Sequence, residues 1–271
     1  MSITNVGENA EWWQSMLTTL PWSIPPSFSR LLGFTVSMIV PDLLHVWNLG
    51  VARHVLGSTL KVILREQVVF HQNNIPERLA AASESLRRYA KSHRLHLRIK
   101  KLTRAKIGWK QRKYPELACS GYDSYVVGKW LQHLLQPHSA TYGDILSVLW
   151  SSNKAISTMY ASDSWFLTQS EKETVRSTGE IFTKLYMKLA GQAIQQHQLL
   201  WRVIPKMHLL SHIFRFHRGV NCARFSTWMD EDFLKKISKV LALTSEKTAQ
   251  KRLLERWLLS LHERMKKNLA D

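Results

Sequence analysis

Three short blocks in this 271-residue sequence combine acids, histidines and lysine at spacings that suit metal or phosphate chemistry. The first block contains Asp42 and His45, followed by Leu-Gly-Val at 49–51. On a helix, residues three apart share one face, so the carboxylate and the imidazole can bind one metal ion. Asp42 also fits a second role, because aspartate is a frequent N-cap of helices. Both interpretations stay open from the sequence.

The second block, at 205–212, reads Pro-Lys-Met-His-Leu-Leu-Ser-His. His208 and His212 are four residues apart on an expected helix, which is a spacing that lets two imidazoles share a zinc ion. His217 lies further along the chain. No glutamate follows His208, so the block does not match the HExxH motif of zinc peptidases. Histidines that pack or cap a helix give the same pattern, and that interpretation is the simpler one.

The third block contains three adjacent acids, Asp230, Glu231 and Asp232, after Thr-Trp-Met at 227–229. Acidic side chains in the first turn of a helix are stabilised by the helix dipole. The alternative interpretation is that one of these carboxylates binds a metal ion.

Positive charge is the main signal in the composition. The chain has 38 Lys and Arg against 20 Asp and Glu, a net charge of +18. Such a charge attracts polyanions, and nucleic acid is the polyanion we expect. Between Arg87 and Lys113 there are 12 basic residues and no acidic one.

Apolar residues, with Trp109 and Tyr114, alternate with the charges of this segment. The segment can therefore pack one side into the protein and present the other to phosphates. A solvated connection between two elements is the other interpretation. The residues expected to bind nucleic acid are Arg98, Lys100, Lys101, Arg104, Lys106, Lys110, Arg112 and Lys113.

Helices must position these blocks, because apolar residues recur at spacings of three and four from residue 43 onward. In the first helix, Trp47, Val51 and Val55 are expected in the core, with Arg53 and His54 outside. Further helices are expected at 76–92, 123–135, 141–161, 170–201, 206–216, 226–243 and 245–269, with a bend of the first helix near Gly57 and a capping box formed by Ser170 and Glu173.

One strand is expected at 34–40, where apolar residues alternate before Pro41 ends the run. The proline-rich stretch 21–26 predicts a linker, so that residues 1–26 form an N-terminal segment and residues 27–271 one mostly helical domain. The apolar run at 31–40 is about half the length needed to span a bilayer, and the N-terminus lacks the pattern of a secretory signal. We therefore expect no membrane association and an intracellular location.

Taken together, the three blocks resemble the C-terminal catalytic part of eukaryotic cut-and-paste DNA transposases of the CACTA-like type, over about 34–261. The resemblance implies an RNase H-like fold with a helical insertion. It also implies three acids that bind two Mg²⁺ or Mn²⁺ ions, which activate water and the DNA 3′-hydroxyl. The expected fold class is therefore mainly α, with a helical insertion and a partial RNase H-like core of few strands.

Asp42 with His45 matches the aspartate-x-x-histidine signature of that family, and Glu231 matches its last acid. The resemblance thus implies Asp42, His45 and Glu231 as catalytic residues and Asp42 and Glu231 as metal ligands. Asp230 and Asp232 are substitutes for Glu231. Whether Asp42 is the second acid itself or only belongs to the signature beside it stays open.

The first catalytic acid of the family has no counterpart here. The acids before Asp42 are Glu8 and Glu11, which leave too little chain for the intervening hairpin strands. One metal site then lacks a ligand, which indicates a fragment or a decayed, domesticated relative. The sequence thus predicts a DNA-binding protein of the nucleus that has lost catalysis, with Mg²⁺ or Mn²⁺ bound only if catalysis survives.

Two rival interpretations remain. One is an active metal-dependent transposase or nuclease that takes its third acid from elsewhere in the chain or from a partner. The other is a helical protein-interaction scaffold whose basic surface meets an acidic protein. Association of identical chains is compatible with all three.

Overall fold

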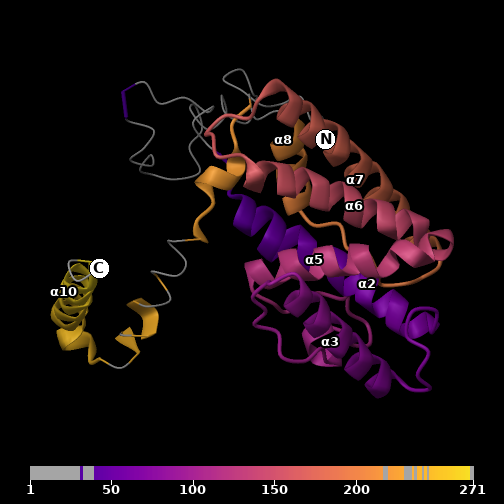
Figure 1. The fold of residues 1–271 in the computed structure, drawn as a ribbon, viewed down its shortest axis with the longest axis horizontal. Coiled ribbons are helices and arrows are strands. Elements are labelled where there is room, and N and C mark those ends of the chain that lie inside the picture. Colours follow the sequence, from indigo (N-terminus) through magenta and orange to yellow (C-terminus); the bar gives the residue numbers. More distant parts are fainter. Residues whose placement is uncertain are drawn as a thin grey trace, which may run out of the picture. The chain divides into compact units, whose positions relative to one another are not determined.

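The computed structural model describes residues 31–32, 40–215, 219–228, 234, 237–239, 241–242 and 244–268. The described residues are mainly helical (Figure 1). The chain divides into two compact units, Met1–Ser226 and Thr227–Asp271. The expected linker at 21–26 and, apart from Val40, the expected strand at 34–40 lie outside the described residues.

The first unit contains a succession of helices, and strand pairing among its described residues is limited to one isolated antiparallel bridge between Phe166 and Val220. The second unit contains η6 (Glu246–Thr248) and α10 (Ala249–Asn268). The helices of the first unit are the π-helical η3 (Leu44–Val51), α2 (Ala52–Glu66), α3 (Ile75–Ser92), α4 (Arg104–Ile107), α5 (Gly121–Leu135), η4 (Gln136–His138), α6 (Ser139–Ala161), α7 (Gln169–Gln195), α8 (Lys206–Arg215) and η5 (Cys222–Phe225).

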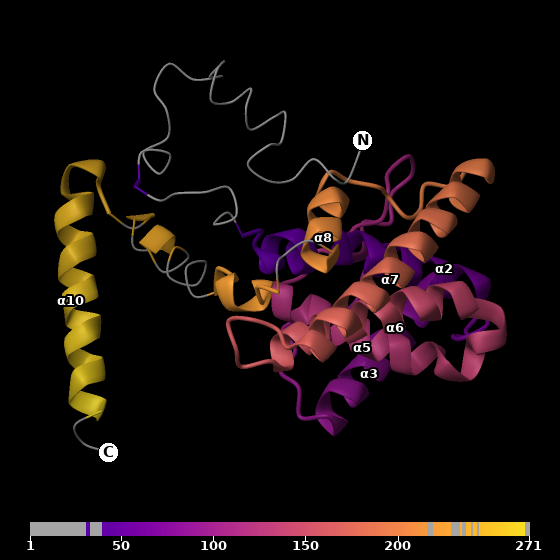
Figure 2. The same cartoon turned by 90° about the horizontal axis from the view of Figure 1, so that it is seen from above.

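Residues 44–66, η3 followed by α2, form what we call the central helix. Both α5 and α8 pack against η3, and both α3 and α5 pack against α2. Helices α6 and α7 lie side by side, and α5 packs against α6 (Figure 2). The first unit is therefore a helical bundle organised around the central helix.

Local capping explains where the helices begin. The Asn74 side chain accepts a hydrogen bond from the backbone N–H of Glu77 at 2.9 Å, and Pro76 occupies the first turn of α3. Helix α7 starts with a capping box formed by Thr168 and Glu171. The prediction of a box at residues 170 and 173 was therefore wrong by two residues. The sequence contains both matches, and the structure uses the first.

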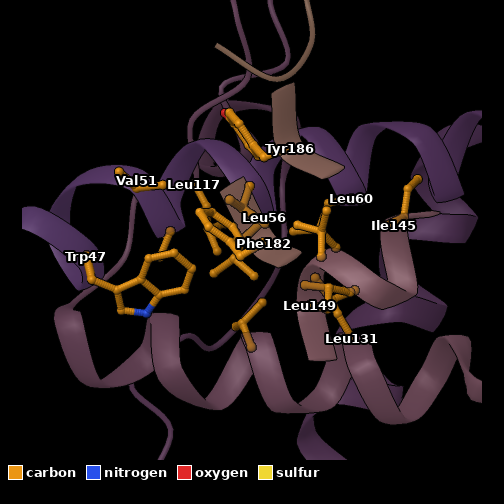
Figure 3. Close-up of a cluster of buried hydrophobic side chains, with 14 of the residues drawn as sticks. Trp47, Val51, Leu56, Leu60, Leu117, Leu131, Ile145, Leu149, Phe182 and Tyr186 are labelled. Carbon is orange, nitrogen blue, oxygen red and sulfur yellow. The ribbon is translucent and has the colours of Figure 1, made fainter. Parts of the chain in front are cut away.

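The apolar stripe of the central helix is buried as predicted. Trp47, Val51 and Val55 all lie in the core, and Trp47 is 6% exposed. The Trp47 ring meets Phe182 of α7 edge-on, with ring centroids 5.5 Å apart (Figure 3). Phe182 stacks in turn with Tyr186, whose hydroxyl donates to the carbonyl of Arg202 at 2.8 Å. Aromatic packing thus ties the central helix to α7.

The prediction that His54 lies outside the core was wrong. Its side chain is buried, with Nδ1 at 3.3 Å from the carbonyl oxygen of Pro115, and burial lowers its pKa. Arg53 is only half-buried and donates to the carbonyl of Cys119 at 2.7 Å. The chain near Pro115 covers the face of the central helix that the amphipathic pattern assigned to solvent.

A buried arginine holds the end of α2 in place. Arg78 of α3 donates to the carbonyls of Leu64 at 2.5 Å, Arg65 at 3.1 Å and Gln72 at 3.0 Å. The C-terminus of a helix carries partial negative charge and unpaired carbonyls, so a cation there is stabilised. Arg78 therefore fixes the turn of α2 that carries Arg65.

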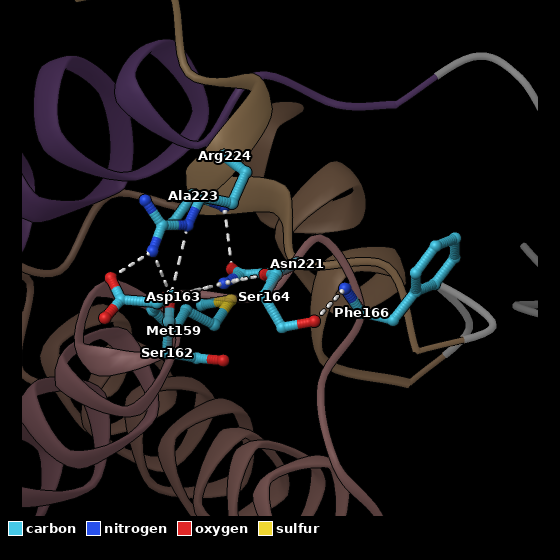
Figure 4. Close-up of polar contacts among 8 residues, drawn as sticks. All are labelled: Met159, Ser162, Asp163, Ser164, Phe166, Asn221, Ala223 and Arg224. Carbon is cyan, nitrogen blue, oxygen red and sulfur yellow. Dashed lines mark hydrogen bonds and ion pairs between the residues drawn. The ribbon is translucent and has the colours of Figure 1, made fainter.

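A buried asparagine binds the C-terminal end of α6. The Asn221 amide donates to the carbonyls of Met159 at 2.9 Å and Ser164 at 3.2 Å (Figure 4). Arg224 of η5 donates to the Ser162 carbonyl at 2.7 Å and to the Asp163 carboxylate at 2.6 Å. The bonds to Met159 and Ser162 pair carbonyls at the end of α6, and those to Asp163 and Ser164 hold the chain that follows.

Both cysteines of the sequence lie in the described part of the chain. Cys119 and Cys222 are both free thiols, and burial raises the pKa of each to about 12. They are inert packing groups rather than nucleophiles. Among the helices that the structure describes, none has the length and apolar character to cross a bilayer.

We predict that Trp47→Ala lowers the free energy of unfolding by about 3–5 kcal/mol, because it leaves a cavity between the central helix and α7. Denaturant unfolding followed by circular dichroism measures the change. The control is Trp150→Ala in α6, because that side chain is 45% exposed. Equal stability losses in the two variants would contradict the described packing of Trp47.

Candidate nucleic-acid interface

The basic segment, residues 98–113, is anchored by its apolar residues. Ile99, Leu102 and Ile107 are buried, and the backbone N–H of Leu102 donates to the Ser83 hydroxyl of α3 at 2.9 Å. The sequence prediction that the segment packs one side and exposes the other is confirmed for these residues. Its charged side chains are thus presented from a fixed backbone.

Seven of the eight predicted nucleic-acid-binding side chains are exposed, and Lys106 is half-buried. Within the described part of the chain, no ion pair joins any of them to a carboxylate. The seven exposed side chains are Arg98, Lys100, Lys101, Arg104, Lys110, Arg112 and Lys113. Cations without carboxylate partners are available to phosphate groups.

Residues 108–114 form what we call the basic loop, and its base is tied to the central helix. The backbone N–H of Leu117 donates to the carbonyl of Arg53 at 2.9 Å. The backbone N–H of Glu116 donates to the carbonyl of Ile107 at 3.0 Å, which closes the loop. The loop is therefore held at its base by backbone bonds, and the His54 side chain adds a contact to the Pro115 carbonyl beside them.

Gly57 lets the loop base approach α2. A Cβ atom at this position would lie 2.9 Å from the backbone nitrogen of Glu116 and 3.0 Å from the carbonyl carbon of Pro115. Helix α2 runs through Gly57 without interruption, and the expected bend there stays a prediction. The glycine serves close backbone approach.

The basic loop, α2 and the chain after α7 together line a cavity of about 490 Å³, which we call the basic cavity. Its cationic residues come from α2, from α4 and from the basic loop. None of the described residues that line it is acidic. The cationic residues are Lys61, Arg65, Arg104, Lys110, Arg112 and Lys113.

Apolar residues line the cavity together with these charges. They are Val62 of α2, Trp109 of the basic loop, and Leu199 and Leu200 of the chain after α7. The guanidinium of Arg104 lies over the Trp109 ring, 5.4 Å from its centroid, which is a cation–π contact. The cavity therefore combines a flat aromatic surface with a dense positive charge.

Sequence reasoning did not find the contributions of α2 and of the chain after α7 to this cavity. Lys61 and Arg65 are four residues apart and so share one face of α2. Desolvation and the charge of Arg65 lower the pKa of Lys61, as expected where cations crowd together. The spacing of these two residues is the only signal in the sequence that marks them.

Asp42 and His45 come together as the spacing predicts. One carboxylate oxygen of Asp42 accepts the backbone N–H of Leu44 at 2.9 Å, and the other contacts Nδ1 of His45. The carbonyl of Asp42 accepts from the backbone N–H of Val46 at 2.9 Å. Asp42 thus caps the start of the central helix, and His45 lies against it.

The first and second sequence blocks meet in space. The Lys206 ammonium of α8 donates to the carbonyl of His45 at 2.9 Å. Its side chain crosses Gly50, where a Cβ atom would lie 2.7 Å from the Lys206 Cδ atom. The sequence did not predict this contact, which joins the Leu-Gly-Val string to the Pro-Lys-Met-His block.

His208 and His212 face each other on α8, with their Nε2 atoms 2.9 Å apart. Burial and the neighbouring His208 lower the pKa of His212. Within the described residues, no group of three or more His, Cys, Asp or Glu side chains is placed to hold a metal ion. His217, like the acids Asp230, Glu231 and Asp232, lies outside them.

The metal set implied by the transposase resemblance is not assembled by the described residues. Mg²⁺ prefers near-octahedral oxygen coordination, whereas the first block offers one carboxylate, already engaged with Leu44 and His45. An ammonium also lies on the His45 carbonyl. Asp42 and His45 thus form a helix start, and the two-metal centre, whose last acid Glu231 lies outside the described residues, stays a prediction.

Comparison with known proteins finds no matching family model, curated protein or solved structure.

We predict that Gly57→Ala lowers the free energy of unfolding by about 1–3 kcal/mol, because the added methyl group forces the loop base away from α2. Gly191→Ala in α7 is the matched control, since a Cβ atom there meets nothing within 4 Å. That control should raise stability by about 0.5–1 kcal/mol through helix propensity. Urea unfolding checks both values, and equal effects of the same sign would refute the close approach at Gly57.

Proposed function

We propose that this chain is a transposase-derived DNA-binding protein that contacts the phosphate backbone through the basic segment. The observation that carries the proposal is the anchored, exposed row of cations at 98–113, which has no carboxylate partner among the described residues. A fixed backbone lowers the entropy lost on binding, because these cations are already displayed before the DNA arrives. Contacts of this kind bind DNA without reading its sequence.

The resemblance of the three sequence blocks to CACTA-like transposases supports the same proposal from a separate direction. The contact of Lys206 with the His45 carbonyl gives the first two blocks a shared structural role at the start of the central helix. We propose the nucleus as the site of action, because chromosomal DNA is the partner. Catalysis is not part of the proposal.

We predict a strong salt dependence of DNA binding that the triple variant Arg98→Ala/Lys100→Ala/Lys101→Ala reduces. Each phosphate contact contributes about 0.9 to the slope of log K against log salt, so three lost contacts reduce the slope by about 2–3. Fluorescence anisotropy with a labelled duplex at several salt concentrations measures it.

The control for this experiment is Arg176→Ala/Lys188→Ala, which removes cations that already pair with Glu180 and Asp144. It should leave the slope within experimental error of the wild type. An unchanged slope of log K against log salt in the triple variant would contradict the proposal. Salt-sensitive binding to an acidic protein, with none to DNA, would favour the interaction scaffold instead.

We predict no Mg²⁺- or Mn²⁺-dependent cleavage of linear DNA above the level of Asp42→Ala. The reason is that both carboxylate oxygens of Asp42 are engaged at the start of the central helix, one by the backbone N–H of Leu44 and the other by His45. Gel electrophoresis of end-labelled duplex after incubation with either metal provides the measurement. Robust cleavage that Asp42→Ala abolishes would establish the active transposase or nuclease in its place.

A further inference from the structure

The basic cavity combines cationic, aromatic and apolar residues, whereas binding of a phosphate backbone requires only cations. Cations on an open surface are enough to follow the phosphates of a duplex. Here six cationic residues line a half-open cavity of about 490 Å³ together with the aromatic ring of Trp109 and apolar side chains. That volume falls within the range of small-ligand sites, which are mostly apolar with a few placed polar groups.

The composition of the cavity limits the ligand that suits it. An apolar ligand would leave Lys61, Arg104 and their neighbours without a counter-charge. An inorganic anion would leave the half-buried side chains of Trp109 and Leu199 in contact with water. A ligand that is flat and aromatic at one end and anionic at the other matches both kinds of lining residue, and a nucleotide has this form.

The placement of the groups agrees with such a ligand. Trp109 belongs to the same loop as Lys110, Arg112 and Lys113, so an aromatic ring and three cations lie within a few residues of one another. Arg104 covers the Trp109 ring at 5.4 Å and supplies a planar guanidinium on which a base can also stack. Lys61 and Arg65 add charge from α2.

We propose that the basic cavity takes one unpaired nucleotide of a DNA strand, with its base against Trp109 and its phosphate among the cations. This inference rests on the proposed function and adds a preference to it. In a duplex the bases stack on one another and cannot reach the ring, whereas a single strand offers them freely. The chain should therefore bind single-stranded DNA, or a frayed end, more tightly than duplex.

The test compares a labelled thymidine strand of about twelve nucleotides with a duplex of the same length, by fluorescence anisotropy. Wild-type protein should prefer the single strand. Trp109→Leu should weaken single-strand binding by about 5- to 150-fold, which corresponds to the loss of one base–aromatic stack, and change duplex binding by less than about twofold. Equal losses on both DNAs, or no loss on either, would overturn the proposal.

A second variant tests the cavity independently, in case Trp109→Leu perturbs the loop. Leu199→Trp adds bulk to the cavity wall without removing any charge, so it should abolish the single-strand preference and retain duplex binding. The control is Arg98→Ala/Lys100→Ala/Lys101→Ala, because these residues do not line the cavity. It should weaken binding of both DNAs by the same factor and keep the preference. If the preference survives Leu199→Trp, the cavity is not the site.

A third measurement separates this inference from the proposed function. Isothermal titration calorimetry with thymidine monophosphate tests the cavity in the absence of DNA. If no DNA binds, the proposed function fails, whereas nucleotide binding that Trp109→Leu abolishes still supports the cavity as a nucleotide site. If the monophosphate binds more tightly than the strand, the ligand is a free nucleotide and the assignment to a DNA strand is overturned. Binding of neither probe refutes both.

Discussion

Burial of the central helix on nearly every side is the constraint on which the first unit depends. Residues 52–64 of α2 are buried with few exceptions, so the polar groups on this helix need partners inside the protein. Ser58 accepts the backbone N–H of Trp201 at 2.9 Å, and Arg53 donates to the carbonyl of Cys119 at 2.7 Å. Each bond brings a distant part of the chain onto the helix. As a result, the basic loop, α8 and the chain after α7 all lie against the central helix.

The periodicity of apolar residues predicted most of this architecture because it reports burial directly. Helix α3 and the burial of Trp47 follow from spacing and from a proline in the first turn. The burial of His54 could not be predicted from the same spacing. An amphipathic pattern assumes that one face of the helix meets water, and here the chain near Pro115 covers that face. The start of α7 was ambiguous for another reason, since two overlapping capping boxes compete in the sequence.

The candidate site was predictable only in its local part. Charges and apolar residues alternate within 98–113, so one stretch of sequence reveals both the anchors and the exposed cations. The basic cavity depends instead on Lys61 and Leu199, which are far from the loop in sequence. Which distant segments meet is decided by the packing of the whole unit, and no short motif encodes it. The hydrogen bond from Lys206 to the His45 carbonyl could not be predicted from the sequence for the same reason.

The base of the basic loop is fastened by backbone atoms, through the bonds of Leu117 to Arg53 and of Glu116 to Ile107. Backbone groups are common to every residue type except for the missing N–H of proline. The shape of the loop is therefore largely independent of which side chains it carries at its tip. Over evolutionary time, the number and identity of charges there can change by single substitutions while the scaffold stays intact. A laboratory selection could exploit the same freedom, diversifying residues 110–113 to tune affinity without redesigning the fold.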